Sequence, residues 1–521
     1  MSVTKAFSVS LLGLSGTIIE IEAEISSNLP SFVLVGLPDA SLTEAKDRVR
    51  AAAHNSGLEL PGRRVTVNLS PASVPKRGSG FDLAIAMAIL AANGRVRPAS
   101  VAEWIHIGEL GLDGTLRGVD GVLASVLAIK RAGWSKVIVA SANLAEAQMV
   151  SEVTVLGARS LAEVARFHGA ALSGEPLISK ILPEESPAKP QVAQADLSDV
   201  IGQDDAVNAL TVAAAGGHHM LMVGPPGAGK TMLAERLPTI LPELSGDELL
   251  EATAVRSIAG IRPSANLRGV ERVRPFEAPH QSATLASLVG GGTKFPRPGL
   301  VSLANQGVLF LDEAPEFQRS ALEALRQPLE SGEVFIHRAT GTARFPARFQ
   351  LVMAANPCPC GNFSGKSRAC TCSASARVAY LAKLSGPLLD RIDIRLRLQA
   401  PNPAQVALAS VGAREVGRSS VEVRSRVTLA RERAKNRLKE TPWSLNSQVP
   451  GSYLRKSLRI APEVRGSLDL ALDRGAISMR GYDRCLRLAW TSADLAGRDA
   501  VSKEDVSNAV LYRGGDGAMS W

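Results

Sequence analysis

The chain has 521 residues, of which 45% are hydrophobic and 21% carry charge. This balance is typical of a folded globular protein and excludes an intrinsically disordered one. Because single hydrophobic cores stop growing beyond about 250–300 residues, the length predicts two to four domains. The net charge of +9 is compatible with binding nucleic acid but, over this length, does not require it.

The hydrophobic pattern predicts a cytoplasmic protein with no membrane partner. The longest apolar run, residues 83–92, is too short to cross a bilayer, which takes about 20 residues. The N-terminus lacks the charged region, apolar segment and cleavage site that make up a secretory signal. Four of the five cysteines lie within fifteen residues, and in a reducing compartment such clustering indicates a metal site rather than disulfides.

Residues 1–172 alternate apolar strands with helical segments and predict an α/β domain. The runs at 31–35 and 64–69 are predicted strands, and those at 40–55 and 81–92 are predicted helices. The second helix is apolar on every side, which predicts that it is buried.

A linker and two further domains are predicted downstream. Residues 173–196 carry four prolines and little periodicity, as interdomain linkers do. Residues 401–521 have helical runs, including 421–440 and 482–497, and almost no strand signal, which predicts a C-terminal helical domain. Residues 197–400 predict a nucleotide-binding α/β domain whose central strands are buried on both faces. Those strands are the apolar runs 220–223, 308–311 and 348–355.

Residues 224–231 match the G-x-x-x-x-G-K-[ST] phosphate-binding loop, with an apolar strand before it and a helix-compatible segment after it. The glycines let backbone N–H groups converge on phosphate oxygens, and the helix adds its N-terminal dipole. Lys230 is expected to reach the β- and γ-phosphates of ATP, and the Thr231 hydroxyl to ligate Mg²⁺. The predicted nucleotide-binding residues are Gly224, Pro225, Pro226, Gly227, Ala228, Gly229, Lys230, Thr231 and Met232.

Polar side chains end the next two predicted strands. Asp312 and Glu313 follow the run 308–311; Asp312 suits a ligand of Mg²⁺, and Glu313 is expected to orient and polarise the attacking water. Asn356 ends the following strand, where its amide is expected to bind the γ-phosphate or the water. Two acids or an Asn-Pro pair taken alone would be ordinary turn chemistry, but the order of the strands favours a catalytic set.

Two arginines are candidates for binding transition-state charge. Arg391 lies between a predicted helix and a predicted strand. It cannot easily reach its own nucleotide across the sheet, so it is expected to act on a neighbouring subunit as an arginine finger. Arg480 opens a helix of the C-terminal domain and is expected to touch phosphate in its own subunit. For both residues a salt bridge is the alternative.

The clustered cysteines predict a zinc site. Cys358, Cys360, Cys370 and Cys372 form two close pairs separated by nine residues. Four thiolates suit a tetrahedral Zn²⁺ ion, which would fold the polar insertion 358–372. The spacing within each pair is tighter than usual, and reduced surface thiols are the alternative. Cys485 falls in a helical segment and is expected to be a buried apolar residue.

Six motifs together resemble the magnesium-chelatase-like branch of the AAA+ ATPases: residues 224–231, 274–280, 288–292, 307–313, 354–361 and 384–393. With its N-terminal region, the whole chain is similar to the ComM/YifB family of bacterial proteins. One departure is that Glu277 and His280-Gln281 stand where the family usually carries Arg and His-His.

This resemblance implies a homo-hexameric ring with ATP sites between subunits, a C-terminal lid, and helicase-like work on single-stranded or branched DNA. The work it implies is branch migration and strand integration during natural transformation and recombination, with recombination proteins as further partners.

Residues 1–172 resemble the Lon-type (S5-type) protease domain. Residues 75–82 match the segment that carries the Lon nucleophile, but the serine position falls on Gly80, with Ser79 one residue early. The downstream segment should bring the catalytic lysine, yet no lysine lies between Arg117 and Ile129. Because a Ser-Lys dyad needs both groups within hydrogen-bond reach, we expect the scaffold without protease activity.

The resemblance also indicates where DNA would bind. Residues 331–345 are a predicted hairpin, which in ring ATPases of this branch faces the pore, and the insertion 256–294 supplies a second candidate loop. Both are expected to meet phosphates rather than bases, which gives sequence-tolerant, salt-sensitive binding. With 4% aromatic residues, base stacking is not expected to dominate. The candidate contacts are His337, Arg338, Arg344 and Lys294.

Three functions are compatible with these features. A DNA-dependent motor ATPase accounts for most of them. A magnesium-chelatase-type ATPase that remodels a partner protein for metal insertion is the first alternative, although such motors usually lack both the cysteine cluster and the Lon-like domain. An ATP-dependent protease is the second, and Gly80 and the missing lysine argue against it.

Overall fold

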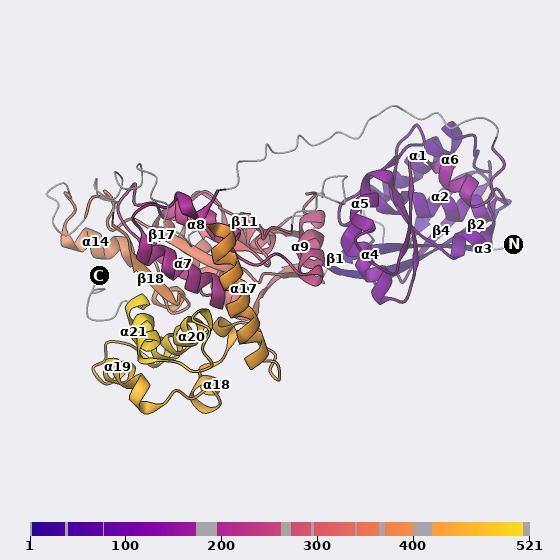
Figure 1. Ribbon diagram of the computed structural model, residues 1–521. Helices are drawn as coiled ribbons and strands as arrows, with labels where there is room; N and C mark the ends of the chain where they lie inside the picture. Colours follow the sequence, from indigo (N-terminus) through magenta and orange to yellow (C-terminus); the bar gives the residue numbers. More distant parts are fainter. Residues whose placement is uncertain are drawn as a thin grey trace.

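The chain forms an elongated molecule in which an N-terminal lobe meets a larger lobe built from the rest of the sequence (Figure 1). The predicted linker lies outside the described residues except for its last two positions. The structure, a computed structural model, describes residues 3–36, 40–76, 78–172, 195–261, 272–292, 296–338, 341–363, 370–399 and 419–513.

The N-terminal lobe is built on a seven-stranded sheet with the order β3-β4-β2-β1-β5-β8-β9. The β1–β2 and β2–β4 pairs are antiparallel, and the others are parallel. The predicted strands at 31–35 and 64–69 are present as β3 and β4. The all-apolar helix is α2, and its residues 82–91 are all buried, as predicted. The bounds are β1 (Thr4–Leu12), β2 (Ser15–Ser26), β3 (Ser31–Val35), α1 (Ala40–Asn55), β4 (Arg64–Ser70), α2 (Asp82–Ala92), α3 (Pro98–Ala102), β5 (Ile105–Ile107), β6 (Glu109–Leu110), β7 (Leu116–Arg117), α4 (Val122–Arg131), β8 (Lys136–Ala140), α5 (Leu144–Ala147), β9 (Thr154–Ala158) and α6 (Leu161–Phe167).

Five parallel strands form the central sheet of the larger lobe, in the order β11-β14-β17-β10-β18. Strands β10, β14 and β17 are wholly buried, as their continuous apolar sequences predicted. Val223 pairs with Ala355, and Leu311 with Met353, so these three strands end at the same edge. The phosphate loop, Asp312 and Asn356 therefore converge there. The strands are β10 (Met220–Val223), β11 (Phe276–Glu277), β14 (Val308–Leu311), β17 (Gln350–Ala355) and β18 (Ile394–Arg397).

Short helices and two hairpins surround this sheet. The predicted hairpin is present as β15 paired with β16 in antiparallel register, from Glu333 opposite Pro346 to Arg338 opposite Gly341. The bounds are α7 (Asp204–Gly216), α8 (Lys230–Ile240), α9 (Gly246–Ile258), α10 (Leu285–Val289), β12 (Gly290–Gly291), β13 (Arg297–Pro298), α11 (Leu300–Leu303), α12 (Arg319–Ala324), α13 (Arg326–Ser331), β15 (Glu333–Arg338), β16 (Gly341–Pro346), α14 (Ala374–Leu381) and α15 (Gly386–Leu389).

The C-terminal helices share one hydrophobic core with the five-stranded sheet. Side chains of α17, α20 and α21 pack with those of α7 and α8 in a single buried cluster. A buried polar contact adds to this, because His218 lies 3.1 Å from Asp393 and 2.8 Å from Thr491 of α20. The C-terminal helices thus continue the hydrophobic core of the larger lobe on the side of the sheet that α7 and α8 cover (Figure 1). They are α17 (Ser420–Arg437), α18 (Gly451–Lys456), α19 (Pro462–Asp473), α20 (Met479–Leu495) and α21 (Lys503–Tyr512).

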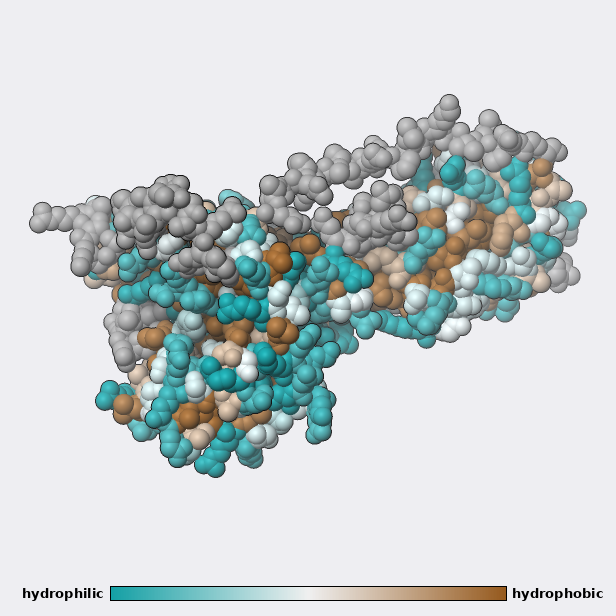
Figure 2. Space-filling model, viewed as in Figure 1, coloured by the Kyte–Doolittle hydropathy of each residue, from teal (hydrophilic) through white to brown (hydrophobic). Residues whose placement is uncertain are grey.

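The exposed side of α17 is polar, and Figure 2 shows hydrophilic residues along it. Its inward positions Val423, Val427, Ala430 and Ala434 are buried at helical spacing. In the part of the chain that the structure describes, no helix is long and apolar enough to cross a membrane.

The two lobes are joined through α9. Leu250, Ala254 and Ile258 on this helix pack into a hydrophobic cluster with α4 of the N-terminal lobe. At the helix end the Ser257 hydroxyl donates to Glu146 over 2.5 Å. The backbone N–H of Gly121 donates to the Ser257 carbonyl oxygen over 3.1 Å. Because a buried polar group is costly unless hydrogen-bonded, these hydrogen bonds fix how α9 is aligned against the N-terminal lobe.

A second contact reaches the β15–β16 hairpin. Gly13, in the β1–β2 turn, lies against the backbone of Arg344, so closely that a Cβ atom there would come 2.6 Å from the Arg344 carbonyl oxygen. Its φ of +63° also favours glycine. The turn of the N-terminal lobe therefore supports the middle of strand β16 in the hairpin.

Candidate nucleotide site

The phosphate loop connects β10 to α8 and adopts the conformation that its glycines permit. Gly227 and Gly229 have φ values of +76° and +81°, in the left-handed region where a side chain is unfavourable. The loop ends at Lys230, which is the first residue of α8. An open cradle of backbone N–H groups at a helix N-terminus is an anion-binding arrangement. Of the other predicted contacts, Ala228 is buried and Met232 is 40% exposed.

Lys230 is held by oxygen atoms that a phosphate group would replace. Its ammonium donates to the carbonyl oxygens of Gly224 and Pro225 over 2.6 and 3.0 Å, and to Asn356 Oδ1 over 3.1 Å. Burial lowers the pKa of Lys230, while the nearby carboxylates of Asp312 and Glu313 raise it. The structure thus brings Asn356 to the phosphate loop.

The two residues predicted to hold Mg²⁺ touch each other. The Thr231 hydroxyl donates to Asp312 Oδ2 over 2.8 Å, and Asp312 Oδ1 accepts from the Glu313 N–H over 2.9 Å. A hydroxyl and a carboxylate are hard oxygen donors of the kind Mg²⁺ prefers. Glu313 itself has φ 50° and ψ 44°, a left-handed conformation that is uncommon in residues other than glycine and recurs at active sites.

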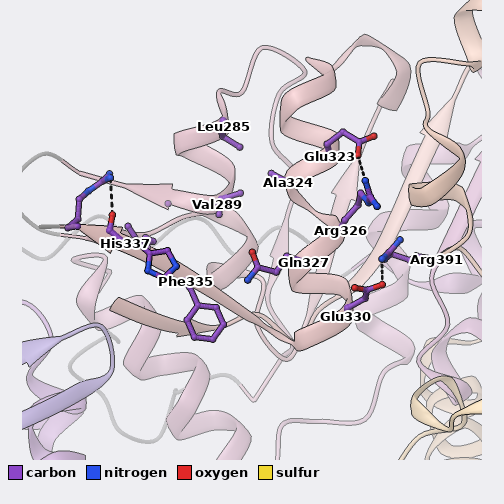
Figure 3. A pocket seen from close by; sticks show the side chains of 13 residues that line it. Leu285, Val289, Glu323, Ala324, Arg326, Gln327, Glu330, Phe335, His337 and Arg391 are labelled. Carbon is purple, nitrogen blue, oxygen red and sulfur yellow. Dashed lines mark hydrogen bonds and ion pairs between the residues drawn. The ribbon is translucent and has the colours of Figure 1, made fainter. Parts of the chain in front are cut away.

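The two candidate arginines lie at the opposite edge of the sheet. Arg391 and Asp390 precede β18, which runs parallel to β10, whereas the phosphate loop follows β10. Arg391 forms an ion pair with Glu330 (Figure 3), and Arg480 forms one with Asp390 over 3.2 Å. Arg391 therefore lies at the edge of the sheet opposite to its own phosphate loop.

Arg480 was expected to touch phosphate in its own subunit, but the structure places it at the edge of the sheet opposite to the phosphate loop. Helix α20 packs against α7 and is anchored by His218 and Asp393 at the amino edge of the sheet. A lid reaching over the nucleotide would lie at the carboxyl edge instead. Arg480 is 75% exposed and forms an ion pair with Asp390, so in this structure it lies away from its own phosphate loop.

The four clustered cysteines come together directly after Asn356. All four Sγ atoms lie within 4.8 Å of one another, and the Cys358–Cys360, Cys358–Cys370 and Cys360–Cys370 distances are 3.4, 3.8 and 3.7 Å. Tetrahedral Zn²⁺ with bonds of about 2.3 Å would separate its sulfurs by about 3.8 Å. The donor set and its dimensions therefore fit zinc.

The thiols differ in acidity, and their loop contacts the phosphate loop. Burial raises the pKa of Cys358 to about 11, whereas the N–H of Asn362, with the Cys358 thiol, lowers that of Cys360 to about 6. Gly361 lies so close to Pro226 that a Cβ atom there would come 2.9 Å from the proline ring.

Three of the predicted DNA contacts lie on the hairpin. His337 hydrogen-bonds Thr342 over 2.9 Å, and Arg338 donates to the carbonyl oxygens of Gly292 and His337. Arg344 forms an ion pair with Glu333, which partly neutralises it. Lys294 lies outside the described residues.

The Lon-like centre shows no dyad among the described side chains. Ser79 donates to Glu109, and the buried Lys76 ammonium donates to the Pro71 carbonyl oxygen. Ser79 and Lys76 are thus each hydrogen-bonded to another group. They do not form the serine–lysine hydrogen bond that proteolysis would need.

Some residues of the site carry no signal in the sequence. Glu330, the partner of Arg391, is 61 positions away from it, and nothing local distinguishes it from other surface glutamates. The aromatic Phe335 could have been noticed, because it alternates with buried Val334 and Ile336 on β15 and shares the outer face with His337.

Three family models match the chain. The one described as magnesium chelatase, subunit ChlI, matches residues 196–406; subunit ChlI of Mg-chelatase matches 21–143; and the ChlI C-terminal model matches 417–513. Together with the parallel sheet and the phosphate loop, these matches define a magnesium-chelatase-like ATPase of the AAA+ class. ATP and Mg²⁺ are the cofactors this class implies.

Several relatives match nearly the whole chain. An uncharacterised protein of Mycobacterium tuberculosis is 47% identical over 515 residues, 98% of this chain and 99% of the relative. Competence protein ComM of Haemophilus influenzae is 41% identical over 516 residues, 98% of each chain. The protein YifB of Escherichia coli is 40% identical over 513 residues, 98% of this chain and 97% of the relative. The chain belongs to the ComM/YifB family.

Two further matches are partial. The magnesium-chelatase 38 kDa subunit of Rhodobacter capsulatus is 29% identical over 197 residues, 34% of this chain and 55% of the relative. Lon protease 2 of Bacillus subtilis is 25% identical over 202 residues, 38% of this chain and 34% of the relative.

Proposed function

We propose that this protein is a DNA-dependent motor ATPase that promotes branch migration and strand integration during DNA uptake and recombination. The observation that supports it most is the division of the ATPase machinery between two edges of one sheet. Lys230, Thr231, Asp312 and Asn356 converge at the carboxyl edge, and Arg391 lies at the other edge, before β18.

Such a division is expected of a subunit in a ring. An arginine that cannot reach its own γ-phosphate can complete the site of the next subunit, as arginine fingers do. Repeated head-to-tail contacts of this kind close into rings, and a homo-hexamer is the ring that the family resemblance implies. Arg480 forms an ion pair with Asp390, the residue before Arg391. In such a ring Arg480 would therefore also face the neighbouring subunit.

Two observations favour DNA as the molecule along which the motor moves. ComM of Haemophilus influenzae is named a competence protein, and it matches nearly the whole of this chain. The chain also carries a net charge of +9, and its hairpin exposes Arg338 and His337, which suits sequence-tolerant binding of a phosphate backbone. Recombination proteins are its natural partners in such work.

The alternatives have weaker support. A chelatase-type ATPase acting on a partner protein is favoured by the three family models, but the chelatase subunit itself matches only 34% of the chain. An ATP-dependent protease is disfavoured because Ser79 is bound to Glu109.

ATP hydrolysis is expected to rise several-fold when single-stranded or forked DNA is added, and the protein should move a synthetic four-way junction in the presence of ATP. The measurement compares phosphate release with and without DNA and follows the junction on a gel. Glu313→Gln should keep ATP binding but lose both activities, because the residue that polarises the water is changed while the phosphate loop is not.

Hydrolysis unaffected by DNA, together with a junction that does not move, would contradict the motor proposal. Stimulation by a protein fraction in place of DNA would favour the chelatase-type alternative.

We further infer that Cys358, Cys360, Cys370 and Cys372 bind one Zn²⁺ ion. Their sulfur spacing and their tetrathiolate chemistry support it. The ion would fold the insertion against Pro226 of the phosphate loop, which makes its role structural.

Protein purified without chelator is expected to contain roughly one equivalent of zinc per chain by elemental analysis. The double variant Cys370→Ser/Cys372→Ser should lose it, because two of four ligands are removed, and its ATPase should fall in parallel. Cys485→Ala is the matched control, since Cys485 is buried in α20 away from the cluster. Zinc below about a tenth of an equivalent in the unchanged protein would count against the site.

A further inference from the structure

A groove of about 720 Å³ lies between α10, the helices α12 and α13, and the outer face of β15. Figure 3 shows His337 near one end and Arg391, paired with Glu330, at the other. Its volume is within the range of about 300–1,000 Å³ that is usual for small-molecule sites. This chain's own phosphate site lies at the other edge of the sheet, so the groove is separate from that site.

Two aromatic rings form a flat surface in this groove. Phe335 and His337 stand two residues apart on β15 and so share one face, while Val334 and Ile336 are buried on the other. The ring centroids are 6.5 Å apart and the ring planes differ by 12°. In Figure 3 both rings lie side by side and are seen nearly face on. Neighbouring aromatic rings with nearly parallel planes can offer their faces to stacking bases.

The charges around the rings favour a polyanion with flat bases. The groove is lined by three arginines and two glutamates, and the glutamates are each ion-paired, Glu323 with Arg326 and Glu330 with Arg391. Arg338 remains as the cation beside the rings. Its hydrogen bonds among the described residues go to carbonyl oxygens, which do not neutralise its charge.

We propose that this groove binds unpaired bases of single-stranded DNA, which stack on Phe335 and His337 while Arg338 contacts the adjoining phosphate. The inference rests on the proposed DNA function and extends it, because the motor would then hold bases as well as the backbone. A duplex does not fit this role, since its bases are stacked on each other and their faces are covered.

The test uses two oligonucleotides of equal length and charge, oligo(dT) and the same strand with a central run of abasic residues. The full-length protein should bind oligo(dT) roughly tenfold more tightly than the abasic strand, because only the former offers rings to stack. Phe335→Leu should lose this preference while binding the abasic strand as before, and Phe335→Tyr should restore it.

Two further variants separate the roles of ring and charge. Arg338→Gln should weaken binding of both strands alike and reduce the slope of affinity against salt by about one. Phe167→Leu is the matched control, because Phe167 is 41% exposed on α6 of the N-terminal lobe and should leave both affinities unchanged.

The possible outcomes are distinct. If the unchanged protein binds neither strand, both the motor proposal and the groove proposal are wrong. If it binds both strands equally well, the groove proposal alone is overturned. If Phe335→Leu changes the size of the assembly and not the preference between strands, the groove is a contact between subunits and the base-binding proposal is again overturned.

Discussion

Replacing Arg391 with alanine is expected to slow ATP hydrolysis on the order of a thousandfold or more, with ATP binding close to that of the unchanged protein. The guanidinium stabilises charge that develops on the γ-phosphate only in the transition state, so its loss affects the rate and not the ground-state affinity. The measurement pairs steady-state phosphate release with equilibrium binding of a fluorescent ATP analogue.

Mixing two inactive variants tests whether Arg391 acts between subunits. A Lys230→Met chain keeps Arg391, and an Arg391→Ala chain keeps its phosphate loop. In randomly mixed rings about a quarter of the interfaces would combine an intact loop with an intact arginine. Activity should therefore return on mixing. An arginine that served its own subunit would leave the mixture as inactive as its components.

Arg326→Ala is the matched control for this prediction. Arg326 lies in the same groove and pairs with Glu323 as Arg391 pairs with Glu330, but it is on α13 and has no predicted role in hydrolysis. Its loss should leave the rate within about twofold, because surface ion pairs contribute little. A comparable rate loss in both variants would indicate a general effect on the assembly.

Replacing Lys230 with methionine is expected to reduce ATP hydrolysis by about a hundredfold to a thousandfold and to weaken ATP binding as well. The side chain of methionine fills similar space but cannot donate to phosphate oxygens. In this structure the ammonium already bridges the phosphate loop and Asn356, so the variant also loses the link between two elements of the site.

The control is Lys503→Met, at the exposed start of α21, which should hydrolyse ATP at the unchanged rate. Phosphate release from Lys230→Met within tenfold of the unchanged protein would mean that the measured activity comes from another site.

The nucleotide side of the site could be predicted from sequence because its signals are local. Each central strand is a short, continuous apolar run, and the residue that follows each run in a parallel sheet must lie at the same edge. That reasoning alone predicts that Asn356 approaches the phosphate loop, and the structure places it 3.1 Å from Lys230. The close spacing of the cysteines likewise predicts the approach of their sulfurs.

The position of the C-terminal helices could not be predicted, because it depends on contacts between distant segments. Helix α20 is strongly amphipathic, with buried residues such as Cys485 and Leu486, so the sequence predicts a packed helix but not its partner. The partner is set by α7 and by the buried pair of His218 and Asp393. For this reason the sequence could not place Arg480, whose role in binding phosphate stays a prediction, at the amino edge of the sheet.

The joint at α9 makes the N-terminal lobe a structural requirement of the larger lobe. Ala254, Ser257 and Glu146 are buried where the two lobes meet. A shortened chain without the first lobe would expose the apolar side of α9 to water and leave the Ser257 hydroxyl without Glu146. The N-terminal lobe therefore acts as a structural support of the larger lobe, through its contacts with α9.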